Sequence, residues 1–151
     1  MRQTLITGTG SYLPERIITN DDLAACMDTS DEWIRQRTGI GQRHMVAEGQ
    51  KTSDLAIAAG EKALEHAGLN ATDLDCIIIA TTTPDDTFPA TAATVQAGLG
   101  ASNAFAFDVQ AVCAGFVYGL DVGDSMVKCG KANKALVIGA ESFTRILDWE
   151  D

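Results

Sequence analysis

The sequence has few aromatic residues, few basic residues and no long hydrophobic run, and each shortage argues against a class of protein. Aromatic residues make up 6% of the 151 residues, so the core must be built from aliphatic side chains and alanine. No apolar stretch approaches the roughly 20 residues that a membrane span requires. The 11 basic residues face 21 acidic ones, and the net charge of −10 argues against a nucleic-acid partner. The start also lacks a secretory pattern, so we predict a cytoplasmic protein with no membrane partner.

Cysteine is scarce too, and its positions match neither a metal site nor a disulfide framework. There are four cysteines: Cys26, Cys76, Cys113 and Cys129. No pair has C-x-x-C spacing, so we predict no zinc or other metal site. A chain of this length without a signal peptide does not need disulfides for stability. We therefore predict four reduced thiols.

Strand-like and helix-like segments alternate along the chain. The pattern predicts strands over residues 4–13, 75–83, 101–109 and 134–142, and helices over residues 21–27, 29–37, 53–68, 91–99 and 113–130. This alternation is typical of βαβ units with a mostly parallel sheet. The last strand is followed by no helix that could cover it, which is an odd end for such a domain. We expect the sequence to be part of a longer protein.

Local signals refine these elements. Asn20 is predicted to cap the first helix, and Thr29 with Glu32 has the spacing of a capping box. The small-residue stripe of the third helix suits close packing against a sheet; it comprises Leu55, Ala59, Ala63 and Ala67. In the last helix we expect Phe116 and Leu120 on the buried face. Gly8 and Gly10 indicate a tight turn rather than a dinucleotide site, because Leu13 stands where the third glycine would be required.

Cys113 lies where a strand is predicted to give way to a helix. A free cysteine is usually a buried, inert core residue. At this position, however, free backbone N–H groups and the helix dipole would favour the thiolate. The small neighbours Ala111, Ala114 and Gly115 leave room for a substrate, as at a nucleophile elbow. Cys113 is thus the one credible nucleophile, and since neither histidine has a setting for a catalytic dyad, we expect its base to lie outside this chain.

Trp33 lies in the most basic stretch of an acidic chain. A lone tryptophan is commonly a core anchor. Arg35, Arg37 and Arg43 stand near it in the sequence, with His44 as a further surface or ligand-contact candidate. An aromatic ring that stacks on a base, beside guanidinium groups that bind phosphates, would form a nucleotide clamp. Both interpretations remain open at this point.

Five segments together resemble the β-ketoacyl-acyl-carrier-protein synthase III family. They are GTGSYLP, TSDEWIRQRTGI, ATTTPDDTFPA, AFDVQAVCAGF and ALVIGAES, in the order and spacing of that family. The resemblance implies an α/β, thiolase-like fold with two similar halves in a five-layered αβαβα architecture and a mostly parallel sheet. Residues 1–151 would be the N-terminal half, which bears the nucleophile, and the C-terminal half is absent from this chain. It also implies a homodimer.

The resemblance assigns roles to individual residues. Cys113 would take the acyl group from acyl-CoA, while Thr29, Trp33, Arg37 and Thr38 would bind CoA. Phe88 and Phe143 would line the acyl pocket, with Phe88 closing the pocket of the dimer partner. No cofactor is implied, because acyl-CoA is a substrate. The family's catalytic histidine and asparagine belong to the second half.

The implied function is that of a transferase, an acyltransferase that starts fatty-acid biosynthesis. It would condense acetyl-CoA or another short acyl-CoA with malonyl-acyl-carrier protein through an acyl-cysteine. This fragment alone is expected to be inactive, since the histidine and asparagine are missing. Two alternatives stay open: a condensing enzyme of secondary metabolism, such as one for a quinolone or a polyketide starter, and a non-catalytic half-domain that binds CoA or carrier protein.

Overall fold

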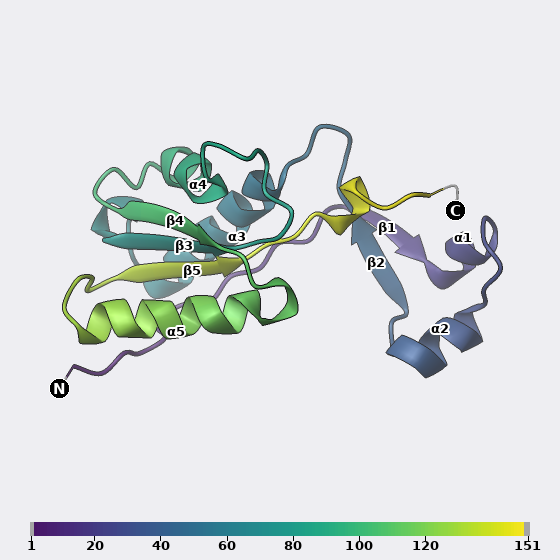
Figure 1. The fold of residues 1–151 in the computed structure, drawn as a ribbon, viewed down its shortest axis with the longest axis horizontal. Coiled ribbons are helices and arrows are strands. Elements are labelled where there is room, and N and C mark those ends of the chain that lie inside the picture. Colours follow the sequence, from purple (N-terminus) through teal and green to yellow (C-terminus); the bar gives the residue numbers. More distant parts are fainter. Residues whose placement is uncertain (1, 150–151) are drawn as a thin grey trace. The chain divides into compact units, whose positions relative to one another are not determined.

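The structure, a computed structural model, describes residues 2–149 and forms two compact units. The larger unit comprises Met1–Tyr12 and Lys51–Glu141, and the smaller unit comprises Leu13–Gln50 and Ser142–Asp151. Figure 1 labels the helices and strands: β1 (Arg16–Thr19), α1 (Asn20–Ala24), α2 (Asp31–Thr38), β2 (Gln42–Met45), α3 (Thr52–Ala67), β3 (Cys76–Ala80), α4 (Thr91–Leu99), β4 (Phe105–Val109), α5 (Gly115–Lys128) and β5 (Ala135–Gly139). Three short 3-10 turns are η1 (Ala71–Asp73), η2 (Val112–Ala114) and η3 (Phe143–Arg145).

The larger unit is a parallel three-stranded sheet with helices on both faces. The strand order is β4-β3-β5, with α3 and α4 on one face and α5 on the other (Figure 1). The central strand β3 is buried along its whole length, as its uninterrupted apolar sequence predicts. Ala80 pairs with Val109 on one side and with Gly139 on the other, so the three strands end at the same level. The predicted strands at β3, β4 and β5 and the helix at α4 are confirmed.

Alternate side chains of β3 build the two halves of this core. Ile77 and Ile79 are fully buried, and they share a core cluster with Leu64 of α3 and Val95 of α4. Ile78 points the other way and packs with Val137 beneath α5. This period of two follows from the pleat of a strand. A strand buried on both faces therefore ties the two layers of helices together.

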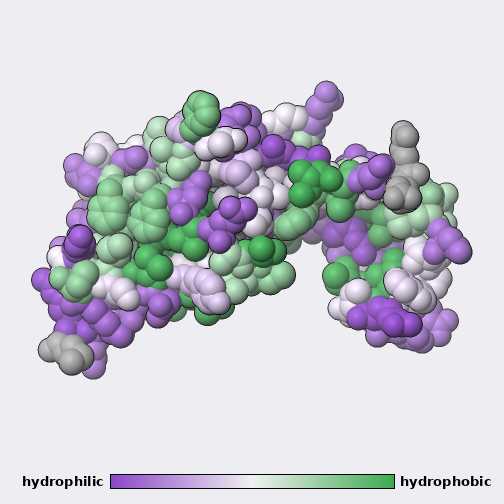
Figure 2. Space-filling model, viewed as in Figure 1, coloured by the Kyte–Doolittle hydropathy of each residue, from purple (hydrophilic) through white to green (hydrophobic). Residues whose placement is uncertain are grey.

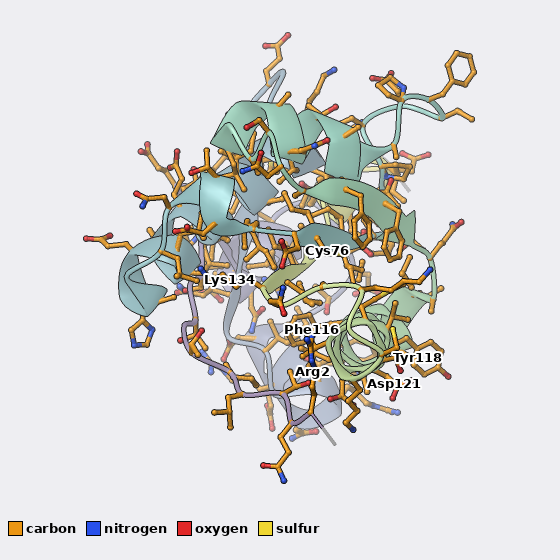
Figure 3. All side chains as sticks on the ribbon, turned by 90° about the vertical axis from the view of Figure 1, so that its left-hand side faces the viewer. Arg2, Cys76, Phe116, Tyr118, Asp121 and Lys134 are labelled. Carbon is orange, nitrogen blue, oxygen red and sulfur yellow. The ribbon has the colours of Figure 1, made fainter. Side chains whose placement is uncertain are left out.

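The buried face of α5 differs from the prediction. Gly115, Gly119 and Gly123 are the buried residues of this helix, spaced four apart. A Cβ atom added to Gly119 would lie 3.1 Å from Cγ1 of Val137, so the helix backbone rests almost directly on the sheet. Phe116, expected to be inside, is 47% exposed. Figure 3 shows α5 end-on, with Tyr118 and Asp121 on the same side of the helix, where both are exposed.

The first segment of the chain is not the strand that the sequence predicts. Residues 2–14 form no helix or strand, and the first strand is β1 instead. Gly8 and Gly10 have no left-handed backbone and make no tight turn. They allow a close approach to α3, because a Cβ atom at Gly10 would lie 2.4 Å from the carbonyl oxygen of Ala59 and from the backbone nitrogen of Ala63. The alanines of the small-residue stripe, Ala59, Ala63 and Ala67, thus face this segment and not the sheet against which they were expected to pack. Gly60 on the neighbouring face packs on the sheet instead.

The smaller unit contains a two-stranded antiparallel pair, β1–β2, that the sequence analysis missed. Its helices α1 and α2 are capped by other residues than predicted: the side chain of Thr19 caps α1, and the hydroxyl of Ser30 accepts from the backbone N–H of Trp33 in α2. Asn20, instead of being a cap, is buried in the first turn of α1. Because Ser30 caps α2, the hydroxyl of Thr29 has no capping role.

Several large hydrophobic side chains are exposed on the larger unit. Figure 2 shows hydrophobic surface between hydrophilic residues; the exposed side chains of this unit include Leu5, Ile6, Phe88, Phe105, Val112, Phe116, Val117 and Tyr118. None of the helices within residues 2–149 is both long and apolar enough to span a membrane.

Candidate functional site

Cys113 lies on a turn between a strand and a helix, as predicted. The strand β4 ends at Val109, the 3-10 turn η2 contains Cys113, and α5 begins at Gly115. The cysteine is exposed. Gly115 allows the turn to approach the sheet closely, since a Cβ atom there would lie 3.3 Å from Cβ of Ala80. The turn therefore presents the thiol to solvent at the carboxyl end of the sheet, where parallel α/β sheets bind their ligands.

The residue before the cysteine has a strained backbone. Val112 has a φ of 48°, and it is the one non-glycine residue with positive φ within residues 2–149. A β-branched residue in this region is a true outlier that costs on the order of 1–3 kcal/mol, and such residues cluster at functional sites. Its side chain is 59% exposed, so burial of the side chain does not explain the strain. The strain sets Cys113 apart from the other cysteines.

The remaining cysteines have ordinary surroundings. Cys76 is fully buried in β3, and burial, together with the Asp75 carboxylate, raises the pKa of its thiol to about 11 (Figure 3). Cys26 and Cys129 are exposed, and each sulfur donates to a helix carbonyl, that of Leu23 and that of Met126 respectively. All four cysteines are free in the structure.

A thiol-labelling experiment tests this division. We expect iodoacetamide at pH 8 to modify Cys26, Cys113 and Cys129 within minutes while Cys76 stays unmodified in the folded chain. With a pKa near 11, the Cys76 thiolate amounts to only about 0.1% of the thiol at this pH, and burial blocks access to it. Peptide mass spectrometry of the labelled chain gives the four extents of reaction. Labelling in denaturant serves as the control, and rapid labelling of Cys76 without denaturant would contradict the expectation.

Trp33 and Arg37 form a pair on the surface of α2. The guanidinium carbon of Arg37 lies 5.6 Å from the centre of the Trp33 ring. Trp33 is 56% exposed, which excludes the role of a core anchor within the smaller unit. The side chains lie one helical turn apart, so the cation covers one aromatic ring while much of the tryptophan remains open.

The other basic residues of this stretch have structural roles, so the expectation that several arginines form a nucleotide clamp with Trp33 is corrected to Arg37 alone. Arg35 donates to Asp31 at 2.8 Å. Arg43 lies on β2 and donates to the Asn20 side chain at 2.8 Å and to the carbonyl of Ile18. His44 contacts the carbonyl of Pro14 through Nδ1, so it too has a structural role within the smaller unit.

Asn20 connects these side chains to the helix that carries Trp33. Its amide nitrogen donates to Asp31 at 2.7 Å and to the carbonyl of Ile40 at 2.9 Å, at either end of α2. The carboxylate of Asp31 also accepts a hydrogen bond from Arg35. The hydrogen bonds from Asn20 and Arg35 keep the pKa of this carboxyl below its usual value. A fully satisfied buried amide rigidifies its surroundings. The network holds α2, and with it the Trp33–Arg37 pair, against the β1–β2 strands.

The two predicted threonines flank α2. The hydroxyl oxygen of Thr29 is shielded from solvent and has no hydrogen-bond partner in the part of the chain that the structure describes. Thr38 ends the helix, and its hydroxyl donates to the carbonyl of Ile34 at 2.8 Å and accepts from the N–H of Ile40 at 3.0 Å.

The two predicted pocket residues lie in different units. Phe88 is in the loop between β3 and α4 of the larger unit and is 83% exposed. Phe143 is exposed in η3 of the smaller unit. The structure therefore gathers Thr29, Trp33, Arg37 and Thr38 around one helix, and it places Cys113 and Phe88 on loops that leave one end of one sheet.

His66, the second histidine, accepts a hydrogen bond at Nδ1 from the backbone N–H of Thr9, with the two nitrogens 3.1 Å apart.

A charged residue that the sequence analysis did not single out lies at this end of the sheet. Glu141 follows β5 and accepts hydrogen bonds from Thr81, Thr82 and Thr83, which follow β3. Both segments directly follow parallel strands, and the carboxyl ends of such strands meet at one edge. The sequence does contain a signal from which this cluster could have been predicted. Three consecutive threonines follow one predicted strand, and a glutamate follows another.

Comparisons with known proteins give similarity along the whole chain. A family model described as 3-oxoacyl-[acyl-carrier-protein (ACP)] synthase III matches residues 107–151. The beta-ketoacyl-[acyl-carrier-protein] synthase III of Hyphomonas neptunium is 58% identical over 150 residues, which make up 99% of this chain and 46% of that protein. The chain spans about half the length of the curated relatives it matches.

Solved structures show the same relationship. The 3-oxoacyl-[acyl-carrier-protein] synthase III from Aquifex aeolicus VF5 matches with a TM-score of 0.93 and 50% identity, covering 97% of this chain and 47% of that one. The priming beta-ketosynthase from the R1128 polyketide biosynthetic pathway matches with a TM-score of 0.92 and 34% identity, covering 97% of this chain and 44% of that one.

Proposed function

Because the chain belongs to the family of β-ketoacyl-[acyl-carrier-protein] synthases III and corresponds to the N-terminal half of its members, we propose that it carries the nucleophile and the CoA site of such an enzyme. Its fold is the N-terminal half of the thiolase-like αβαβα architecture. The observation that carries the proposal is the exposed Cys113 on a strained turn between β4 and α5.

In the proposed reaction Cys113 acts first. As a thiolate, its sulfur forms a bond to the thioester carbonyl carbon of acyl-CoA while the bond to the CoA sulfur breaks, and CoA leaves as its thiolate, so that one thiolate replaces another. The backbone N–H of Cys113 would stabilise the charge that develops on the carbonyl oxygen. No cofactor enters this step, since acyl-CoA is itself the substrate.

The second stage uses malonyl-acyl-carrier protein. Loss of CO2 from the malonyl group leaves a carbanion, which attacks the carbonyl of the acyl-cysteine, so that the sulfur leaves and a β-ketoacyl-carrier protein forms. The histidine and asparagine that support decarboxylation in the family would come from the second half. We therefore expect residues 1–151 to accept the acyl group at best and not to complete the cycle. The proposal includes a homodimer in the cytoplasm for the whole protein.

CoA would bind at α2. Trp33 would stack on the adenine, while Arg37 would pair with phosphate. Thr29 and Thr38 would line the same site at the two ends of α2. Phe143 would border the acyl chain of the substrate, and Phe88 would close the acyl pocket of the dimer partner.

Mass spectrometry tests the proposal directly. The product of the complete gene is incubated with acetyl-CoA, and it is then digested so that its peptides can be mapped. We expect one acetyl group, attached to Cys113 and absent from the exposed Cys26 and Cys129. Acetylation spread over all exposed thiols would indicate chemical transfer without a site, and no acetylation at all would refute the proposed function.

A second function stays open because the R1128 priming β-ketosynthase matches almost as well in structure, with a TM-score of 0.92. Such an enzyme would use the same cysteine chemistry to start a secondary metabolite. The two functions differ in the acyl group they accept. Comparing the rates of Cys113 acylation with acetyl-CoA and with longer acyl-CoA primers separates them.

A Trp33→Ala variant tests the CoA site alone. We expect the Kd for CoA to rise about 5- to 150-fold, because stacking of a base on an aromatic ring contributes about 1–3 kcal/mol. Isothermal titration calorimetry gives the Kd. Gln36→Ala is the matched control, since Gln36 lies exposed on the same helix and pairs only with Glu32 among the described contacts. Equal Kd values for the two variants would show that CoA does not stack on Trp33.

A further inference from the structure

Two loops of the larger unit begin at the same level of the sheet. Residues 81–90 leave β3 and carry Phe88, and residues 110–114 leave β4 and carry Cys113. The last paired residues of the three strands are Ala80, Val109 and Gly139, in register. The contacts that hold the first residues after these strands therefore also determine where both loops begin.

Glu141, two residues beyond the end of β5, binds the start of the Phe88 loop with both carboxylate oxygens. Oε1 accepts from the backbone N–H of Thr82 at 2.8 Å and from its hydroxyl at 2.7 Å. Oε2 accepts from the backbone N–H of Thr83 at 3.0 Å and from the hydroxyls of Thr83 and Thr81. Partial burial opposes ionisation of Glu141, but the hydrogen bonds from Thr83 and Thr82 outweigh it and keep the pKa of the carboxyl below its usual value.

This cluster is connected to the turn of Cys113. The backbone N–H of Thr81 donates to the carbonyl of Val109 at 3.1 Å, at the end of β4. The carboxylate of Asp108, one residue earlier, accepts from the N–H groups of Thr91 and Ala92 at 2.8 and 2.7 Å. The Phe88 loop is thus held at its start by Glu141 and at its end by Asp108. The exposed Phe88 stands between the two anchors.

We propose that Glu141 is a positioning residue of the acyl site: its carboxylate holds Thr81–Thr83 and thereby fixes the Phe88 loop beside the turn that carries Cys113. The inference rests on the proposed function, because that function gives Phe88 its place at the acyl pocket of the dimer partner. Glu141 itself touches no reacting atom. Its effect on the reaction passes through the loop.

The chemistry of the contacts requires a carboxylate. The N–H groups of Thr82 and Thr83 donate to different carboxylate oxygens, and the N–H of Thr83 is shared with the hydroxyl of Thr81. A glutamine has one acceptor oxygen, and its NH₂ group can only donate. Glu141→Gln therefore places a donor NH₂ group against one of these N–H groups although size and shape are kept. The N–H of Thr82 would lose its acceptor, or that of Thr83 would keep only the hydroxyl of Thr81 at 3.1 Å. Glu141→Asp keeps both acceptor oxygens on a shorter side chain and serves as the rescue variant.

The experiment compares the wild type, both Glu141 variants and Glu61→Gln as the product of the complete gene. Glu61 is an exposed glutamate on α3, so Glu61→Gln removes the same charge as Glu141→Gln without altering the contacts of the Phe88 loop. Amide hydrogen exchange of residues 82–90 reports on the loop. Intact mass spectrometry gives the rates at which Cys113 accepts acetyl and hexanoyl groups from CoA. A melting curve confirms that each variant is folded at the temperature used.

We expect Glu141→Gln to speed exchange in residues 82–90 about tenfold or more, since the loop then opens locally. The ratio of the acetyl to the hexanoyl rate should shift about fivefold or more, because small displacements at a reacting site change rates strongly. Glu141→Asp should recover most of both effects, and Glu61→Gln should match the wild type. A merely structural residue would lower both acylation rates equally and leave their ratio unchanged.

Two results overturn the inference. Unchanged exchange in Glu141→Gln means that the carboxylate does not hold the loop, and an unchanged acyl ratio means that the loop does not shape the acyl site. Failure of the proposed function looks different, since the wild type itself would then accept no acyl group. The exchange measurement still decides in that case whether Glu141 orders the loop.

Discussion

A Cys113→Ala variant incubated with acetyl-CoA is expected to keep its own mass, while the unchanged protein gains one acetyl group. Alanine has no nucleophile, and the other exposed thiols, Cys26 and Cys129, lie at helix ends without a strained turn. The rate of adduct formation should fall by a factor of at least about 10³, as is typical when a nucleophile is removed. Intact mass spectrometry over time measures it.

The matched control is Cys129→Ala, which removes an exposed thiol at the other end of α5. This variant should be acetylated like the unchanged protein. Binding of CoA at α2 should also survive in Cys113→Ala, because none of the residues around Trp33 is altered. An adduct that persists in Cys113→Ala would remove the cysteine from its proposed role.

The second large effect is expected from Gly119→Val, which should lower the free energy of unfolding by about 3 kcal/mol. The first added carbon already lies 3.1 Å from Cγ1 of Val137 and 3.7 Å from Cγ2 of Ile78, so the valine methyl groups have no room. Valine has a better helix propensity than glycine, but that gain is only a few tenths of a kcal/mol and does not offset overpacking. Chemical denaturation of the chain measures the change.

Tyr118→Val is the control for this prediction. It places valine next to Gly119 in the sequence, on the exposed side of α5 (Figure 3). We expect a change of no more than about 0.5 kcal/mol, as for ordinary surface substitutions. Similar losses in the two variants would mean that the glycine face does not set the distance between helix and sheet.

The sequence could predict those elements whose signal is local and strong. The run from Cys76 to Ala80 is apolar throughout, so a strand buried on both faces was the evident interpretation. The helix at Thr91–Leu99 has a proline-containing loop before it and a glycine after it, and its bounds were predicted correctly. The place of Cys113 followed from the order of strand, small residues and helix.

The parts that were missed depend on partners distant in the sequence. Gly10 suggests a turn when it is considered alone, and its contact with Ala59 and Ala63 becomes visible only when the segment lies against α3. In α5 the side chain of Phe116 is larger than anything on the glycine face, so a hydrophobicity pattern places it inside. The helix nevertheless buries its glycines, because only they allow its backbone to lie this close to β3 and β5. The strands β1 and β2 are short and carry charged residues, which conceals their pairing.

The pairing of Arg37 with Trp33 also bears on how a polyanion such as CoA would reach this chain. With a net charge of −10, the long-range field repels a negatively charged ligand. A single guanidinium attracts it only within a Debye length, about 8 Å at physiological ionic strength. Electrostatic capture from a distance therefore contributes little here. Affinity would then depend on the contacts made after arrival, and the hydrogen bonds of the buried Asn20 hold α2, with Trp33 and Arg37, in place for them.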